Sequence, residues 1–446
     1  MSNAAYSPAR LLRGARRRAK LALGPGFRIA ADFIFQPVAR RARRNSRRWV
    51  FGHERGEFAG NPKFLYLWLL GREDIEPYWI TGNWRVWRKL RRQGWPASLR
   101  WSPWGIGRTL TAGAVFYAHR TSDVNAALVR GALLVNLWHG VGLKAISLGW
   151  DRGRTARLRS AEPSRLDWAK NRTYLTDPDL VVTTSSFMQK HFSDQFRLNV
   201  ERCPILGYPR LDVASEPELA LRSRQFDEPR QFALRPPGVT EVHVYMPTSR
   251  DSNRPLLREA IPDFARLEGL LAARNAIFYI KLHPQTFERI PAEFEHVRKW
   301  PDGVDIYNYL GDLDALITDY SSVLYDYVAL RGGAGAIIYA YDLEEYLSRD
   351  RTLLYPFKDN IAGTLVRDFD RLCEHLAAGI GSMSADPAQA EAIRAKFWGS
   401  SARTASSRIY DHVRSTLGLA QHAPIQEPSS GPLASIAPAA SSMADA

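Results

Sequence analysis

Polar motifs stand directly behind apolar runs of strand length, and the first of them is built around a histidine. His139 and Gly140 follow the run 132–138. An imidazole has a pKa near working pH, so it can accept a proton from a hydroxyl group. The glycine permits a tight turn whose backbone amides can meet an anion. The alternative is a histidine that only packs or caps the turn.

Two similar motifs lie in the second half of the chain. Arg250 lies in the stretch 247–251, which follows an apolar run. An arginine at a strand end can bind a phosphate through two hydrogen bonds. The alternative for Arg250 is an ion pair with the adjacent Asp251. His283 follows the run 276–282, and its alternative is an ordinary hydrogen-bonded loop histidine.

The last motif combines one carboxylate with two hydroxyl groups. Asp319, Ser321 and Ser322 follow the run 315–318 and precede a helical pattern at 323–330. A helix N-terminus with hydroxyl groups beside it can bind an anion, although a simple helix cap is the alternative. A chance distribution would also place such residues within helices. Their shared position after strands therefore predicts a site for a phosphorylated ligand.

The elements that must position these motifs are alternating strands and helices. Alternation of this kind predicts an α/β fold with mostly parallel sheets, in which ligands bind beyond the carboxyl ends of the strands. We expect two Rossmann-like domains that face each other across a cleft. The predicted strands are 49–52, 114–117, 132–138, 180–184, 242–246, 276–282, 315–318 and 336–339.

Composition shifts divide the chain further. Residues 48–215 and 239–415 form the two expected α/β domains, and the polar, proline-bearing stretch 216–238 is expected to link them. Residues 421–446 are rich in Ala, Ser and Pro, which predicts a disordered tail. Residues 1–47 form a basic arm.

The net charge of +15 favours polyanionic partners, namely anionic lipid, nucleic acid or phosphorylated substrates. In the arm, two arginine clusters flank the apolar segment 27–35, a pattern that suits an anionic membrane surface. A solvated, disordered arm is the alternative. Nucleic acid is not an expected partner, because no nucleic-acid-binding motif accompanies the charge.

The remaining composition fits a protein of the cytoplasm. The two cysteines, at 203 and 373, have neither metal-ligand nor disulfide spacing, which fits a reducing compartment. We expect no signal peptide and no spanning helix, because charges interrupt the N-terminal region and no apolar run reaches ~18 residues. No cluster of carboxylates predicts a metal site, and no cofactor is expected.

At these motifs the sequence resembles the CDP-glycerol glycerophosphotransferase family, the teichoic-acid primases and polymerases. The resemblance covers about residues 48–415 and keeps the order and spacing of the motifs. The matching stretches are 138–144, 207–212, 247–251, 281–284, 319–322 and 341–346, with 61–63 as an early segment.

The resemblance implies a glycosyltransferase-B-like fold whose C-terminal domain holds a CDP-activated donor. It implies that His139 acts as the base, with His283 a second catalytic residue that also holds the donor. Further implied site residues are Arg250, Asp319, Ser321 and Ser322 for the donor phosphates, and Gly140, Lys144, Arg210, Asp212 and Thr248 as other motif positions.

The implied reaction moves glycerol phosphate, or a related polyol phosphate, to a hydroxyl of a lipid-linked primer or polymer and releases CMP. The implied place is the inner face of the plasma membrane. Two alternatives remain: a nucleotide-sugar glycosyltransferase of the same fold, and a non-catalytic protein that binds membranes or polyanions. The polyol, the acceptor, and the choice between primase and polymerase stay open.

Overall fold

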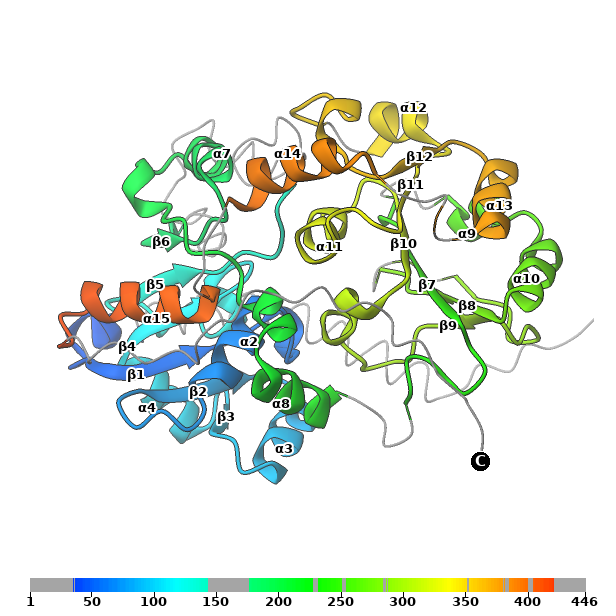
Figure 1. Ribbon diagram of the computed structural model, residues 1–446. Helices are drawn as coiled ribbons and strands as arrows, with labels where there is room; N and C mark the ends of the chain where they lie inside the picture. Colours follow the sequence, from blue (N-terminus) through cyan, green and yellow to red (C-terminus); the bar gives the residue numbers. More distant parts are fainter. Residues whose placement is uncertain are drawn as a thin grey trace, which may run out of the picture.

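The computed structural model contains two parallel sheets of six strands each, which lie side by side (Figure 1). This confirms the predicted α/β fold with two Rossmann-like units. The structure describes residues 35, 37–142, 176–227, 232–250, 254–283, 286, 288–350, 353–379, 381, 385–399 and 404–420.

The first sheet has the strand order β3-β2-β1-β4-β5-β6. Its central strand β4 is buried on both faces, as its uninterrupted apolar sequence requires. The strands are β1 (Asn45–Phe51), β2 (Glu76–Thr81), β3 (Ala97–Leu99), β4 (Ala112–Tyr117), β5 (Leu133–Asn136) and β6 (Leu180–Val181). The helices of this unit are α2 (Gly60–Leu69), α3 (Trp84–Arg92), α4 (Pro103–Leu110), α7 (Ser186–Phe196) and α8 (Pro217–Asp227).

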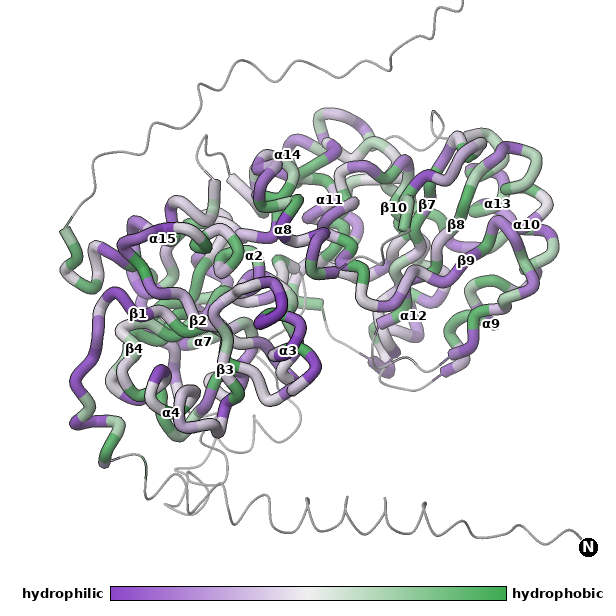
Figure 2. The backbone as a smooth tube through the Cα atoms, turned by 90° about the horizontal axis from the view of Figure 1, so that it is seen from below, coloured by the Kyte–Doolittle hydropathy of each residue, from purple (hydrophilic) through white to green (hydrophobic). Residues whose placement is uncertain are grey.

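The second sheet has the order β12-β11-β10-β7-β8-β9. The hydrophobic stretches of the tube coincide largely with the strands of both sheets (Figure 2). The strands are β7 (Glu241–Met246), β8 (Ala276–Ile280), β9 (Val297–Lys299), β10 (Ala315–Thr318), β11 (Ala336–Tyr339) and β12 (Thr364–Val366). The helices of this unit are α9 (Leu256–Ala260), α10 (Phe264–Ala273), α11 (Val323–Arg331), α12 (Leu343–Glu345), α13 (Phe369–Ala378) and α14 (Pro387–Trp398), and the last helix of the chain is α15 (Ala405–Thr416).

The predicted strands exist, and β10 and β11 have the predicted bounds. Four strands were not predicted. Three of them, β3, β9 and β12, have only three residues each, too few to show a pattern. The fourth, β2, contains Pro77, a residue type that strand interiors usually exclude.

Two segments depart from the expected domain bounds. Half of the expected linker 216–238 is the helix α8, whose Phe226 packs 4.5 Å from the ring of Phe58. The expected second domain runs to residue 415, but α15 returns to the first sheet, where Tyr410 packs 6.1 Å from Trp49. Both helices carry apolar residues that are buried against the first unit, and this packing decides where they lie.

Two buried ion pairs join the units. Lys63 of α2 contacts Asp227 of α8 and lies 2.9 Å from Asp305, which precedes the 3₁₀ helix Ile306–Asn308 of the second unit. Arg210 of the first unit pairs with Asp326 of α11 at 2.6 Å. A buried pair of this kind is costly to break, so these contacts fix how the two units face each other.

Most of the basic arm and the whole predicted tail 421–446 lie outside the described residues. Within the described part of the chain, no helix is both long and apolar enough to cross a membrane.

Candidate active site

His139 lies on the turn that follows β5. The preceding Trp138 has a left-handed backbone (φ 53°), a conformation that costs a non-glycine residue free energy and often marks a functional turn. Asn136 and Asn61 stabilise this turn. The Asn136 carboxamide oxygen accepts from the Trp138 N–H at 2.9 Å, and Asn61 Nδ2 donates to the carbonyls of Leu137 and Trp138 at 3.0 Å.

The hydrogen bond of the ring fixes the tautomer of His139. Its Nδ1 lies 3.2 Å from the Ala118 carbonyl oxygen. A carbonyl can only accept, so Nδ1 carries the proton and Nε2 is left as an acceptor. A neutral imidazole with a free Nε2 is the form that a general base needs.

Two further histidines adjoin His139. The ring of His119 stacks on His139 with centroids 4.3 Å apart, and the ring of His53 meets His119 edge-on at 5.1 Å. His139 is exposed to solvent on one side. The protein packed around its ring lowers its pKa well below the usual value, and the neighbouring His119 lowers that pKa further. His139 is therefore neutral at neutral pH.

The sequence analysis missed His53 and His119, although the signal was present. His53 comes one position after the predicted strand 49–52, and His119 comes two positions after the predicted strand 114–117. Both lie two positions beyond the observed ends of β1 and β4. The strand-end rule that selected His139 therefore selects them as well. All three lie at the carboxyl edge of the first sheet.

Gly140 and Ser322 bring the two units into direct contact. A Cβ on Gly140 would lie 2.5 Å from Ser322 Oγ, so any larger residue at this position would displace the Ser322 side chain. Ser322 directly precedes α11, and Ser321 Oγ lies 3.5 Å from the Val323 N–H. The structure thus joins the His139 turn of the first unit to the N-terminus of α11 in the second.

Arg210 holds this contact in place. One of its amino groups donates to the His139 carbonyl oxygen at 2.6 Å, and the other donates to both carboxylate oxygens of Asp326 at 2.6 and 2.9 Å. The Tyr307 hydroxyl donates to the same carboxylate at 2.6 Å. Asp326 was not predicted, although an acidic residue within the apolar helical pattern 323–330 was a possible signal.

Asp212 has a different environment. Its carboxylate accepts from the backbone N–H groups of Ala405 and Ser406 at 2.9 and 2.7 Å, where α15 begins. Burial raises the pKa of Asp212 to about 6, and the N–H donors oppose that rise. Its observed contacts therefore hold α15 on the first unit.

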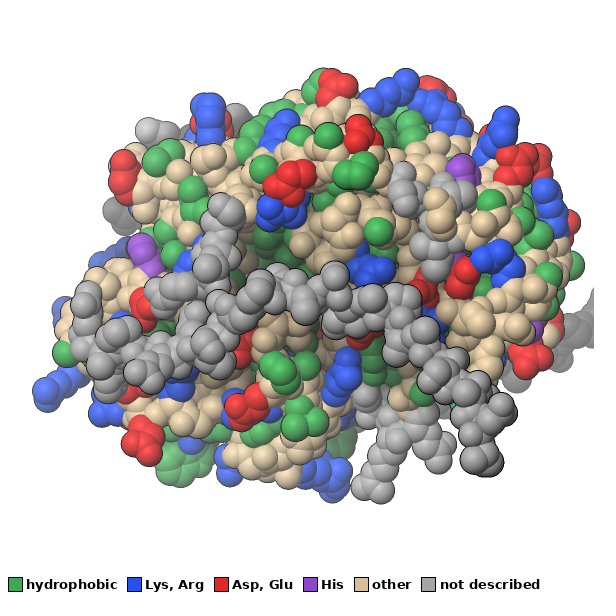
Figure 3. Space-filling model, in the orientation of Figure 1, with side chains coloured by type: hydrophobic (Ala, Val, Ile, Leu, Met, Phe, Trp, Pro, Cys, Tyr) green, Lys and Arg blue, Asp and Glu red, His purple; other side chains and the backbone are tan. Residues whose placement is uncertain are grey.

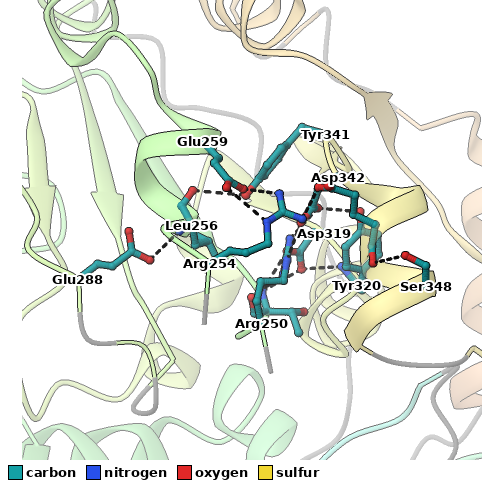
Figure 4. A network of polar contacts seen from close by, with 12 residues as sticks. Arg250, Arg254, Leu256, Glu259, Glu288, Asp319, Tyr320, Tyr341, Asp342 and Ser348 are labelled. Carbon is teal, nitrogen blue, oxygen red and sulfur yellow. Dashed lines mark hydrogen bonds and ion pairs between the residues drawn. The ribbon is translucent and has the colours of Figure 1, made fainter. Parts of the chain in front are cut away.

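Arg250 lies in a buried network of charges (Figure 4). Its guanidinium donates to both oxygens of Asp342 at 2.8 and 2.9 Å and lies 2.9 Å from an oxygen of Asp319. It also donates to the Thr248 carbonyl at 2.6 Å. With 6% of its surface exposed, Arg250 is held by these carboxylates. Asp251, its alternative partner in the sequence analysis, lies outside the described residues.

Asp319 in turn holds the backbone of the loop after β7. Its carboxylate accepts from the Thr248 N–H at 2.9 and 3.1 Å. Thr248 Oγ1 is buried and has no hydrogen-bond partner among the described residues. A buried hydroxyl of this kind needs a partner, and a bound ligand or water can supply one. Arg250 and Asp319 thus hold the backbone of Thr248 from both its N–H and its carbonyl side.

His283 is exposed on the loop after β8. The strands β8, β7 and β10 are parallel neighbours, so His283, Thr248 and Asp319 follow strands at one edge of the second sheet. Among the described residues, no group of three or more His, Cys, Asp or Glu could hold a metal ion. Lys144 lies outside the described residues.

A comparison with known families matches residues 34–415 to the model of the CDP-Glycerol:Poly(glycerophosphate) glycerophosphotransferases. The chain belongs to this family. The match covers most of the chain and confirms the family predicted from the motifs. The protein is therefore an enzyme of the glycerophosphotransferase type.

Named relatives of this glycerophosphotransferase act in teichoic-acid synthesis. A teichoic acid glycerol-phosphate transferase of Staphylococcus aureus is 25% identical over 72% of this chain and 80% of its own. A teichoic acid ribitol-phosphate primase of Bacillus spizizenii is 27% identical over 54% of this chain and 60% of its own.

A solved structure supports the fold of the glycerophosphotransferase. The wall teichoic acid polymerase TagF superposes with a TM-score of 0.67 at 19% identity, covering 93% of this chain and 99% of the solved chain. At that identity the likeness concerns the fold alone. It agrees with the two facing α/β units found here.

Proposed function

We propose that this glycerophosphotransferase moves glycerol phosphate, or a related polyol phosphate, from a CDP-activated donor to a hydroxyl of a teichoic-acid-like polymer or its primer. The observation that carries the proposal is the contact between Gly140 and Ser322. The turn that carries His139 on one unit thereby adjoins the N-terminus of α11 on the other, which supports the proposal. A base and an anion site on facing units are what transfer of a phosphoryl group to a hydroxyl requires.

In the proposed reaction, Nε2 of His139 takes the proton of the acceptor hydroxyl. The acceptor oxygen then attacks the β-phosphorus of the donor, which carries the polyol. The bond from that phosphorus to the bridging oxygen breaks, and CMP leaves with the bonding electron pair. The low pKa of His139 keeps its nitrogen free to accept the proton at neutral pH.

We assign the donor phosphates to the edge of the second sheet. The N-terminus of α11, with Ser321 and Ser322, would neutralise their charge together with His283. We also assign Arg250 to the donor site, where its contacts with Asp319 and Asp342 favour positioning over direct phosphate binding. One matched TagF structure was obtained with CDPG.

We further propose a lipid-linked acceptor and a peripheral position on the inner face of the plasma membrane. The support is the basic arm, whose arginines flank an apolar segment. The acceptor would approach the first unit, where His139 lies.

The test is product release from a panel of donors: CDP-glycerol, CDP-ribitol and UDP-sugars. We expect CMP release with one CDP-polyol and none with UDP-sugars. His139→Ala should abolish release, whereas the matched control His412→Ala on α15 should not. UDP release, or equal activity of the two histidine variants, would overturn the proposal.

A further inference from the structure

Three tryptophans of the first unit are exposed to solvent. The exposed fractions are 55% for Trp84, 43% for Trp101 and 74% for Trp104. Tryptophan is usually among the more buried side chains, and exposed aromatic residues gathered in one region of a fold mark an interaction surface.

The three tryptophans come from adjoining elements. Strands β2 and β3 are parallel neighbours, and the Arg100 N–H donates to the Thr81 carbonyl at 2.8 Å where the two strands end. Trp84 and Trp101 follow these two strand ends directly. Trp104 lies in the first turn of α4, which starts after the cap residue Ser102. All three therefore lie at the carboxyl edge of the first sheet.

The same region is strongly basic. No Asp or Glu occurs between Glu76 and Asp123 in the sequence. The tube of α3 is largely hydrophilic (Figure 2). Basic and hydrophobic side chains lie on the surface in the region of α3 and α4 (Figure 3). The exposed cations of α3 are Arg85, Arg88, Lys89, Arg91 and Arg92.

Among the described residues, none of these five cations forms an ion pair. Most arginines on the second unit behave differently: Arg371 pairs with Glu374 and Arg394 with Glu391. The positive charge of α3 therefore remains available to an anionic partner.

The basic arm joins the fold at this place. The ring of Phe35, the first described residue, lies 6.3 Å from the ring of Trp101. The chain before Phe35 carries the first arginine cluster and most of the apolar segment. The described end of the arm, at Phe35, thus lies beside one of the exposed tryptophans.

We propose that Trp84, Trp101 and Trp104, with Arg88, Arg91 and Arg92, form a docking surface for an anionic lipid membrane. We call it the α3–α4 surface. Indole rings favour the boundary between lipid head groups and acyl chains, and the arginines beside them would contact anionic head groups. A soluble polyanion would match the arginines but would offer no apolar layer to the three indoles.

This inference goes beyond the proposed function, in which the arm alone contacts the membrane. The α3–α4 surface lies at the same carboxyl edge as His53, His119 and His139, which follow β1, β4 and β5. A lipid-linked hydroxyl held at the membrane would then reach the edge of the sheet that carries the proposed base. The surface would orient the folded enzyme, and the arm would add affinity.

The test is sedimentation of the full-length protein with vesicles of phosphatidylglycerol and phosphatidylcholine. Arg88→Gln, Arg91→Gln and Arg92→Gln are combined in one variant. The matched control combines Lys299→Gln, Arg371→Gln and Arg394→Gln, which removes the same charge from exposed pairs of the second unit. At roughly one decade or less per cation, we expect the α3 variant to partition on the order of a hundredfold more weakly.

Trp84→Ser with Trp104→Ser tests the apolar part. Its loss of binding should persist at high salt, where the contribution of the arginines is screened. Both surface variants should keep wild-type melting curves and CMP release with a soluble acceptor analogue, so failure of the surface and failure of the proposed function can be told apart.

Equal partitioning of the α3 variant and its control would overturn the proposal. So would a variant that loses binding to soluble polyphosphate while it keeps its vesicle binding, because the surface would then serve a polymer and not a membrane.

Discussion

The buried pair of Arg210 and Asp326 makes a prediction in which stability and activity separate. Asp326 is fully buried and Arg210 is 2% exposed, and the two residues belong to different units. Asp326→Asn leaves the guanidinium buried without its carboxylate. Breaking one partner of such a pair costs about 3–5 kcal/mol, so the free energy of unfolding should fall by that amount.

The double variant Arg210→Met with Asp326→Leu should separate the effect on stability from the effect on turnover. Two apolar side chains of similar volume remove both buried charges, and such replacements are often neutral or stabilising. Stability should therefore return to within about 1 kcal/mol of the wild type. The His139 carbonyl, however, loses the donor that holds its turn. Turnover should stay low, because a shift of ~1 Å at a reacting group can cost about 100-fold.

Urea unfolding followed by circular dichroism measures the first quantity, and CMP release measures the second. Glu374→Gln, which breaks the exposed pair with Arg371, is the control and should change stability by less than about 1 kcal/mol. If the double variant regains activity together with stability, Arg210 does not position His139. If Asp326→Asn costs no more than the control, the pair does not hold the units together.

Three further outcomes follow from the site. His139→Ala should slow transfer by about 10²–10⁴-fold with an unchanged melting temperature, and near-normal CMP release would reject the base assignment. His119→Phe keeps an aromatic ring but removes a group that lowers the pKa of His139. That pKa should rise, so the acidic limb of the kcat/KM profile should move to higher pH; an unmoved limb would contradict the stacking argument. Gly140→Ala places a Cβ 2.5 Å from Ser322 Oγ and should cut kcat more than about tenfold, as a misplaced reacting group can. Gly142→Ala, whose nearest atom would lie 3.8 Å away, should not.

Much of the fold follows from local sequence patterns. Continuous apolar runs predicted most of the strands. His139, His283 and Asp319 lie beyond the carboxyl ends of strands, as their positions after such runs predicted. Strand β2 was not predicted, because Glu76 and Pro77 at its start leave only a short apolar run behind them.

Local sequence patterns do not predict which residues the site arginines contact. Arg250 was expected to face a phosphate or Asp251, but it pairs with Asp342, a residue 92 positions away. The partner of Arg210 likewise comes from the second unit. Only tertiary packing decides which charges meet, so the sequence identified these arginines without showing what they contact.

The central claim is that a polyol phosphate, not a sugar, is transferred. The most direct test is mass spectrometry of a soluble acceptor analogue after incubation with CDP-glycerol, with CMP measured in the same sample. The account predicts that the acceptor gains whole glycerol-phosphate units and that one CMP appears for each unit gained. An acceptor that gains glycerol without phosphate while CDP is released, or an acceptor that gains mass only from a UDP-sugar, would contradict it.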